Sequence, residues 1–226
     1  KKLQTITLGC SKNKVDTEHI LSQVEDLYEI IPEGEDIPVD VILLNTCGFI
    51  GDAKEESIQA VLEAVDRKNR GEASKVIVFG CLSQRYANEL PELIPEVDAW
   101  FGAREFDPVV RELGVEPSAD KASDRHLTTP SHYAYLKISE GCDRRCSYCA
   151  IPFIRGAHKS VPMEDLILEA EKLAAKGVRE LIIIAQDTTY YGLDLYKRRA
   201  LAELLQKLSE VEGIEWIRIH YSYPAA

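Results

Sequence analysis

The sequence predicts an α/β protein built around an open sheet of parallel strands. Short runs rich in Val, Ile and Leu alternate with segments whose apolar residues recur at helical spacing, and this alternation is typical of βαβ units. A long polar stretch then interrupts the pattern, and further βαβ units follow it. Three of the six cysteines come just after predicted strands of the first series, and the other three lie together in the second.

The first series contains three predicted strands, and each ends shortly before a cysteine. The strands are Gln4–Leu8, Val39–Leu44 and Lys75–Phe79, which precede Cys10, Cys47 and Cys81. The segment 15–27 has helical spacing, and a second helix follows the second strand, with one apolar face made of Ile58, Val61, Leu62 and Val65.

Parallel strands place their carboxyl ends at one edge of a sheet, and ligands bind outside that edge. The three cysteines are separated by 37 and 34 positions, yet this topology brings them to the same edge. Three thiolates there suit an iron–sulfur cluster or zinc. The alternative is three buried cysteines without a ligand, since a free cysteine packs as a small apolar group.

The polar stretch 114–132 predicts a boundary, so we expect domains at 1–116 and 133–226 joined by a linker at 117–132. A strand at Tyr133–Ser139 leads directly into Cys142, Cys146 and Cys149. A helix is expected to begin near Pro162 and to stop before Gly177. The remaining predicted elements are the strand Arg179–Ala185, the helix Leu201–Leu208 and the strand Ile214–His220.

Charge and hydropathy restrict the class of protein. The net charge of −11 disfavours general binding to nucleic-acid phosphates and suits a basic protein partner. No apolar run reaches the roughly 18 residues of a membrane span, and we see no signal peptide. We therefore expect a cytoplasmic protein without a membrane partner, in which disulfides are the weaker interpretation of the cysteines.

The motif Cys142-x3-Cys146-x2-Cys149, with Tyr148 before the third cysteine, resembles the signature of the radical S-adenosylmethionine (SAM) superfamily. The resemblance implies a 4Fe-4S cluster held by three thiolates, with the fourth iron left for SAM. Electron transfer from the cluster would then cleave SAM to a radical. A zinc knuckle without its fourth ligand, or a chance spacing, is the alternative that the residues leave open.

Three further stretches resemble the N-terminal domain of the methylthiotransferase family: LGCSKNKVDTE, NTCGFIGDAKEESI and GCLSQRY. SEGCDRRCSYCAIP and AQDTTYYGLDLY are most similar to its RimO branch. The resemblance implies that Cys10, Cys47 and Cys81 hold an auxiliary 4Fe-4S cluster. It also implies that the second domain is the first part of a radical SAM partial (β/α) barrel.

The implied function is that of a transferase that adds a methylthio group to the β-carbon of an aspartate in small-subunit ribosomal protein twelve. Two clusters and SAM would be the cofactors: one SAM methylates a sulfur on the auxiliary cluster, and a second provides the radical. Flavodoxin or ferredoxin is the expected kind of electron donor.

Several other residues are weaker candidates. Tyr148, Gln186 and Asp187 would contact SAM, although the last two could instead cap the end of a strand. Arg144 and Arg145 would raise the potential of the cluster, face the electron donor or lie in solvent. The segment Lys12 to Lys14 would attract an acidic donor or the substrate, or would also be solvated.

Two rival functions are retained. One is a transfer-RNA methylthiotransferase of the MiaB type, the only case that calls for nucleic acid. The other is a non-catalytic iron–sulfur or zinc protein. The chain supplies about three strands of an expected six-stranded partial barrel and no TRAM domain. We therefore expect the 226 residues to bind clusters but not to turn over.

Overall fold

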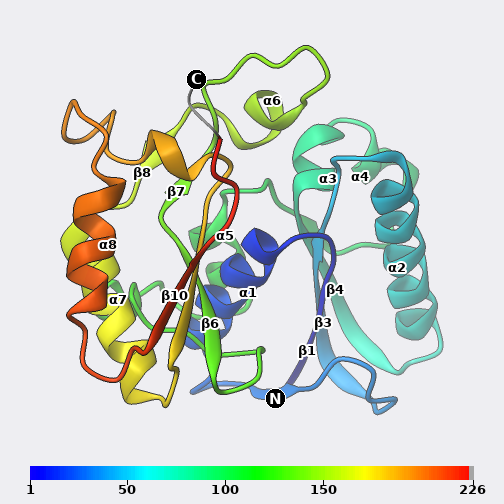
Figure 1. The fold of residues 1–226 in the computed structure, drawn as a ribbon. Coiled ribbons are helices and arrows are strands. Elements are labelled where there is room, and N and C mark those ends of the chain that lie inside the picture. The colour runs from blue at the N-terminus through cyan, green and yellow to red at the C-terminus, as the bar shows by residue number, and fades with distance from the viewer. Residues whose placement is uncertain (224–226) are drawn as a thin grey trace. The chain divides into compact units, whose positions relative to one another are not determined.

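The computed structural model describes residues 1–223 (Figure 1). The chain forms two compact units, Lys1–Ala119 and Asp120–Ala226, which we call unit 1 and unit 2. Each unit has its own parallel sheet and its own hydrophobic core. The predicted α/β class with parallel sheets is confirmed.

Unit 1 is built on a five-stranded sheet of the order β2-β1-β3-β4-β5, in which every neighbouring pair is parallel. The strands are β1 (Lys2–Thr7), β2 (Glu29–Ile31), β3 (Val39–Thr46), β4 (Ala73–Gly80) and β5 (Ala99–Trp100). This is a doubly wound order in which β1 and β3 flank the point where the strand order reverses, and proteins with this order bind ligands outside the carboxyl ends at that point.

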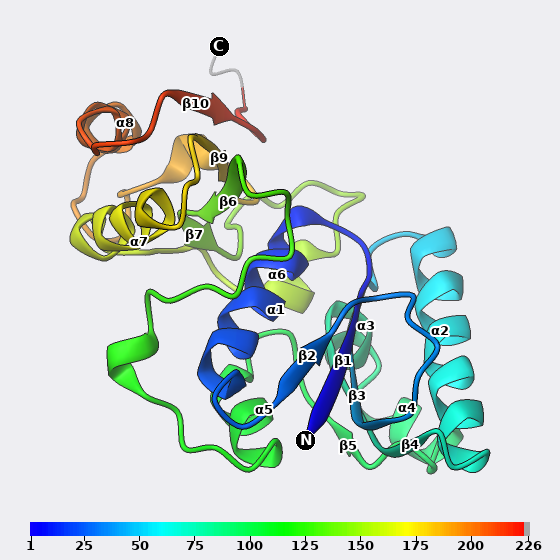
Figure 2. The same ribbon diagram turned by 90° about the horizontal axis from the view of Figure 1, so that it is seen from below.

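Helices cover both faces of this sheet (Figure 2). They are α1 (Ser11–Val24), α2 (Gly51–Asn69), α3 (Cys81–Arg85), α4 (Leu90–Leu93) and α5 (Phe106–Glu112). Residues of α1 and α5 share one core cluster with β3 and β4, whereas α2 packs on the opposite face in a second cluster. The central strands are buried on both sides, which explains their nearly continuous apolar sequences.

The apolar face predicted for α2 is partly wrong. Val61 and Val65 are buried, but Ile58 and Leu62 remain 38% and 42% exposed. The helix instead turns Ser57 inward, because the Ser57 hydroxyl donates to the Cys47 carbonyl and accepts from the Cys47 amide. The side of the helix that faces the sheet therefore combines this polar contact with the buried side chains of Val61, Ala64 and Val65.

Unit 2 contains a three-stranded parallel sheet of the order β10-β9-β6. Its strands are β6 (Tyr133–Lys137), β9 (Glu180–Ile184) and β10 (Trp216–Ile219), and its two longer helices are α7 (Met163–Ala175) and α8 (Leu201–Ser209). Both helices lie on the same side of the sheet (Figure 1) and share one core cluster with it. The predicted βαβαβ sequence of elements is present.

Short elements complete unit 2. The antiparallel strands β7 (Ser139–Glu140) and β8 (Lys159–Ser160) pair with each other, and the remaining pieces are α6 (Ile151–Arg155), η1 (Ala119–Lys121) and η2 (Thr188–Tyr190). Part of the stretch expected as a linker belongs to this unit, since Arg125 is buried and pairs with Glu169 at 2.6 Å. Within residues 1–223, no helix combines the length and the apolar composition needed to cross a bilayer.

Candidate cofactor sites

The three cysteines of unit 1 lie along the same carboxyl edge of the sheet. β1, β3 and β4 are neighbours, and Cys10, Cys47 and Cys81 follow them within three residues. The Sγ atoms of Cys10 and Cys81 lie 3.9 Å and 4.0 Å from the same atom, Asn13 Oδ1. Two thiols that are 71 positions apart in the sequence therefore face one turn of chain.

Cys47 reaches the same turn through a close approach to Gly9. A Cβ atom at Gly9 would lie only 2.8 Å from Cys47 Sγ, and the backbone there has φ +87°. Glycine is needed at this position for both reasons. Cys47 and Cys81 are buried, whereas Cys10 is partly exposed.

Asn13 organises this edge, a role that the sequence did not reveal. Its Nδ2 donates to the carbonyls of Leu8 and Thr46, at 2.8 Å and 3.3 Å. Its own carbonyl accepts a bond from Asn45 Nδ2 at 2.8 Å. Asn13 and Lys12 are both buried, so the solvated alternative for Lys12 to Lys14 is wrong for these two residues, and attraction of a donor or the substrate stays a prediction. They lie on the inner side of the first turns of α1.

The three cysteines of unit 2 lie on an excursion from the sheet that we call the cysteine loop, residues 141–158. The pair β7–β8 closes its base. Above the base, the Cys142 amide donates to the Gly156 carbonyl at 3.0 Å, and the His158 amide donates to Asp143 Oδ1 at 3.0 Å. Gly141 has φ +71°, and a Cβ atom on it would lie 2.1 Å from the Ala157 carbonyl oxygen.

The thiols of this loop are more accessible than those of unit 1. Cys142, Cys146 and Cys149 are all partly exposed, and a turn brings the Cys149 amide to the Cys146 carbonyl at 3.0 Å. Burial raises the pKa of the Cys142 thiol. Tyr148, expected to contact SAM, is 86% exposed. Within residues 1–223, no three His, Cys, Asp or Glu side chains are grouped closely enough to hold one metal ion.

A charged network surrounds Glu140, at the base of the cysteine loop. Lys137 Nζ and Arg155 Nη1 each donate to Glu140 Oε2 at 2.9 Å. The Gly141 amide and Gln186 Nε2 donate to its other oxygen, at 3.0 Å and 3.1 Å. Burial raises the pKa of Glu140, but Lys137 and Arg155 outweigh it and lower the pKa to about 2. Glu140 is therefore a carboxylate that binds four donors.

Gln186 and Asp187 differ in the room they leave for a ligand. Gln186 Oε1 is buried without a hydrogen-bond partner, so it is an acceptor available to a ligand. Asp187 uses one oxygen to accept from the amide and hydroxyl of Thr189, at 3.0 Å and 2.6 Å, and the other to bind Arg144. Asp187 thus caps η2, whereas the sequence predicted either a SAM contact or a cap at the end of the preceding strand. The two arginines of the cysteine loop have different surroundings. Arg144 forms an ion pair with Asp187, whereas Arg145 is exposed.

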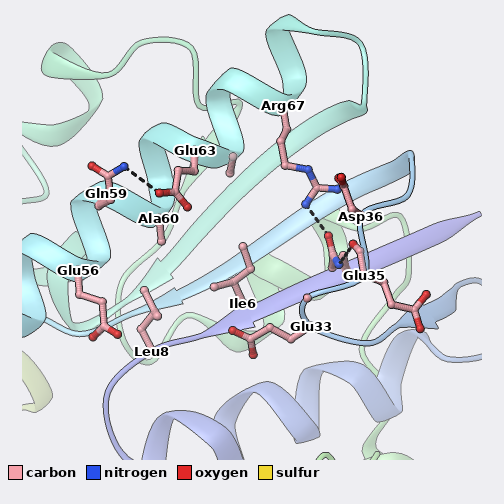
Figure 3. Close-up of a pocket in the computed structure, with 13 residues that line it drawn as sticks. Ile6, Leu8, Glu33, Glu35, Asp36, Glu56, Gln59, Ala60, Glu63 and Arg67 are labelled. Atoms are coloured by element: carbon pink, nitrogen blue, oxygen red, sulfur yellow. Dashed lines mark hydrogen bonds between the residues drawn. The ribbon is translucent and has the colours of Figure 1, made fainter.

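A separate groove lies on unit 1 between α2 and the loop that follows β2 (Figure 3). It has a volume of about 490 Å³, and none of the six cysteines lines it. Ile6 and Ala60 belong to its apolar lining, and Arg67 crosses one end to donate to Gln4 Oε1 at 2.6 Å. The acidic residues around it are Glu33, Glu35, Asp36, Glu56 and Glu63.

Comparisons with known proteins match both units. Residues 2–102 fit the model of an uncharacterised protein family, UPF0004, and residues 136–225 fit that of the radical SAM superfamily. A protein of Christiangramia forsetii named ribosomal protein uS12 methylthiotransferase RimO is 52% identical over 223 residues, which are 99% of this chain and 49% of that protein. A protein of the same name from Bacteroides thetaiotaomicron is 50% identical over 226 residues, all of this chain and 52% of that protein.

Solved structures of lower similarity share the fold. The radical SAM methyltransferase TsrM from Kitasatospora setae, with cobalamin and a [4Fe-4S] cluster bound, aligns with a TM-score of 0.58 at 12% identity. That alignment covers 92% of this chain and 50% of TsrM. The cobalamin-dependent enzyme OxsB, with aqua-cobalamin and SAM bound, has a TM-score of 0.58 at 13% identity, covering 95% of this chain and 38% of OxsB.

The chain spans about half the length of the curated relatives it matches. Its two family matches together run through both units, and the relatives named RimO are about half identical to it from end to end. The chain therefore belongs to the radical SAM methylthiotransferase family, on its RimO branch.

Proposed function

We propose that this chain is the cluster-binding part of an enzyme that methylthiolates ribosomal protein uS12. Cys10, Cys47 and Cys81 would hold one 4Fe-4S cluster, and Cys142, Cys146 and Cys149 would hold the other. The observation that carries this proposal is that Cys10, Cys47 and Cys81 follow neighbouring strands at one carboxyl edge, where Asn13 lies within 4.0 Å of two of the thiols and Gly9 approaches the third.

The residues present fit these cofactors. In each unit the donors are three thiols without a fourth cysteine, and thiolates are the usual protein ligands of iron–sulfur clusters. Gln186 Oε1 is a buried acceptor without a partner, which suits the ammonium group of an amino-acid ligand such as SAM. When bound, the cluster and SAM supply the radical chemistry that removes hydrogen from an unactivated carbon.

The chain's own groups would bind and orient the cofactor. Glu140 fixes Gln186 by accepting from its Nε2 and so turns Oε1 toward a ligand. Because the pKa of Glu140 is about 2, the carboxylate stays charged at neutral pH and keeps Lys137 and Arg155 in place. We assign no SAM contact to Asp187, whose two oxygens are engaged, and we retain Tyr148 as an exposed group available to SAM.

The substrate is proposed from the names of the relatives and from charge. Unit 1 has 12 Lys and Arg against 23 Asp and Glu, whereas unit 2 has 15 of each, so the whole net charge of −11 lies on unit 1. An acidic unit suits a basic ribosomal protein as partner. A flavodoxin or ferredoxin as electron donor and a cytoplasmic location complete the proposal.

Anaerobic reconstitution of the chain tests the ligand assignment. We expect about eight irons per chain, and about four when Cys10, Cys47 and Cys81 are all replaced by Ala. The matching replacement of Cys142, Cys146 and Cys149 should also leave about four. Stoichiometric zinc, or an iron content that neither replacement lowers, would refute the assignment.

We propose to test the activity itself on a version of the protein as long as the relatives. Incubated with SAM, a reductant and uS12, that protein should add the mass of one methylthio group to an aspartate of uS12. Transfer of the group to transfer RNA instead would favour the MiaB-type alternative.

A further inference from the structure

The side chain of Arg144 connects the cysteine loop to the sheet of unit 2. Arg144 lies between Cys142 and Cys146, and its Nε donates to Asp187 Oδ2. Its guanidinium carbon lies 3.7 Å from the ring centroid of Tyr223 and 4.8 Å from that of Tyr190. One arginine thus combines an ion pair with two cation–π contacts.

The three partners of Arg144 come from the carboxyl ends of two neighbouring strands. Asp187 and Tyr190 follow β9, and Tyr223 follows β10. Asp187 is itself fixed, because its other oxygen accepts from the amide and the hydroxyl of Thr189. We call Asp187, Tyr190 and Tyr223 the Arg144 socket. The carboxylate of this socket is already oriented when the guanidinium binds to it.

Arg144 follows Cys142 by two residues, so the side-chain contacts of Arg144 restrain the backbone next to this cysteine. On the other side of the loop, Cys142 is held through its own amide by the Gly156 carbonyl. Cys142 therefore lies in the sequence between two anchors, the base of the loop and the contacts that hold Arg144.

Arg144 is more buried than the neighbouring Arg145. The Arg144 side chain is 24% exposed and the Asp187 side chain is 5% exposed, so this ion pair is screened less than a surface pair. Arg145 carries the same charge at the next position, but it is exposed. The two arginines form a matched pair for experiment, because they carry the same formal charge but only Arg144 is held by the socket.

We propose that Arg144 is a positioning residue, which fixes the cysteine loop against the ends of β9 and β10 and so holds Cys142 in place before a cofactor binds. The importance of this geometry for catalysis rests on the function proposed above; the geometry itself does not. If Arg144 acted only through its charge, Arg145 would have a comparable effect.

Hydrogen exchange on the metal-free 226-residue chain tests the anchor without any cluster. In R144A, we expect the amides of residues 142–149 to exchange about tenfold faster, because the loop opens more often once its ion pair and ring contacts are lost. In R145A, the same amides should stay within about twofold of the parent chain. Amides of β6 and β9 should be unchanged in both variants.

Further variants separate the parts of the socket. R144K keeps the charge but loses the planar stacking, so it should recover only part of the protection, and Y223L should lose part of it while Arg144 is intact. In a double-mutant cycle, R144A and D187N should be less than additive, because each removes the same ion pair. Y223L and D187N keep the test available if R144A does not fold.

A spectroscopic readout links the anchor to the cofactor. In the reconstituted protein, the change that SAM produces in the electron paramagnetic resonance spectrum of the reduced cluster should weaken several-fold in R144A and persist in R145A. Equal loop exchange in R144A and R145A would overturn the proposal. Failure of the chain to bind iron, with the exchange result intact, would contradict the proposed function alone.

Discussion

Asn13 shows how one buried amide can organise a site whose chemistry belongs to other residues. It bonds to the backbone just before Cys10 and just before Cys47, and its Oδ1 faces the thiols of Cys10 and Cys81. Without the Asn13 amide, the carbonyl groups that it binds would lack a hydrogen-bond donor where little water can replace it, and an unsatisfied buried carbonyl is costly. The arrangement of the thiols therefore depends on a side chain that is not itself an expected ligand.

Replacing Asn13 by Ala tests this dependence. We expect N13A to lower the free energy of unfolding by about 1–3 kcal/mol, because the buried carbonyl of Thr46 and the part-buried carbonyl of Leu8 lose their donor, and to reduce the iron bound by unit 1. Urea denaturation and iron analysis measure the two effects. K14A, one residue further along the same helix and partly exposed, should change stability by less than about 0.5 kcal/mol. Equal losses in the two variants would contradict the role of Asn13.

Asp194 makes a pH-dependent contribution to unit 2. Burial raises the pKa of this carboxyl, but hydrogen bonds from the hydroxyl and the amide of Ser160 outweigh burial and hold the pKa below its usual value. A carboxyl with a lowered folded-state pKa stabilises the protein fully above its unfolded-state pKa. That stability is lost as the pH falls through the folded-state pKa.

We therefore expect D194N to destabilise the chain by about 1 kcal/mol, by a constant amount from pH 7 to about pH 5. The difference from the parent chain should shrink only at lower pH. Urea denaturation at several pH values measures it. A difference that already disappears between pH 7 and pH 5 would mean that the pKa of Asp194 is not lowered.

The candidate site could be predicted from the sequence only for residues whose identity signals their chemistry. The six cysteines stood out by spacing and by position after strands. Asn13 and the pairing of Arg144 with Asp187 did not, because an ordinary polar side chain gains its role from partners 32 to 43 positions away. Only the tertiary fold brings such partners together.

At the scale of elements, the length of each strand decided whether the sequence could predict it. β3 and β4 are eight residues each and buried on both faces, so their apolar runs were clear. β2, β5, β7 and β8 have two or three residues and show no periodicity. Yet β7 and β8 are the pair that closes the cysteine loop, so the base of a candidate site carried the weakest sequence signal.

Gly141 tests the importance of this loop base. Both Gly141 and Gly177 have positive φ, but only at Gly141 would an added Cβ meet backbone, at 2.1 Å from the Ala157 carbonyl oxygen. We expect G177A to cost about 1–2 kcal/mol from backbone strain, and G141A to cost clearly more, because the 156–157 segment must move. Urea denaturation compares the two. A G141A chain as stable as G177A would show that the loop base adjusts without cost.

At the scale of the molecule, acidity and hydrophobic burial follow the division into two units. The excess of acidic residues lies entirely on unit 1, and each of the three core clusters is confined to one unit. A unit of 119 residues with its own core is of ordinary domain size. These facts support unit 1 as an independent folding unit.

We predict that residues 1–119 fold alone. Their two core clusters are complete within the fragment, so the fragment should unfold in urea in one cooperative transition, with a slope of about 1–3 kcal/mol/M. A shorter fragment, residues 1–100, provides the control: it lacks α5, whose Val109 and Val110 are buried against α1 and the central strands. That fragment should lose the cooperative transition, because one face of its sheet is left partly uncovered. A gradual, non-cooperative unfolding of residues 1–119 would show that unit 1 needs the rest of the chain, and the two thiol trios would then belong to a single folding unit.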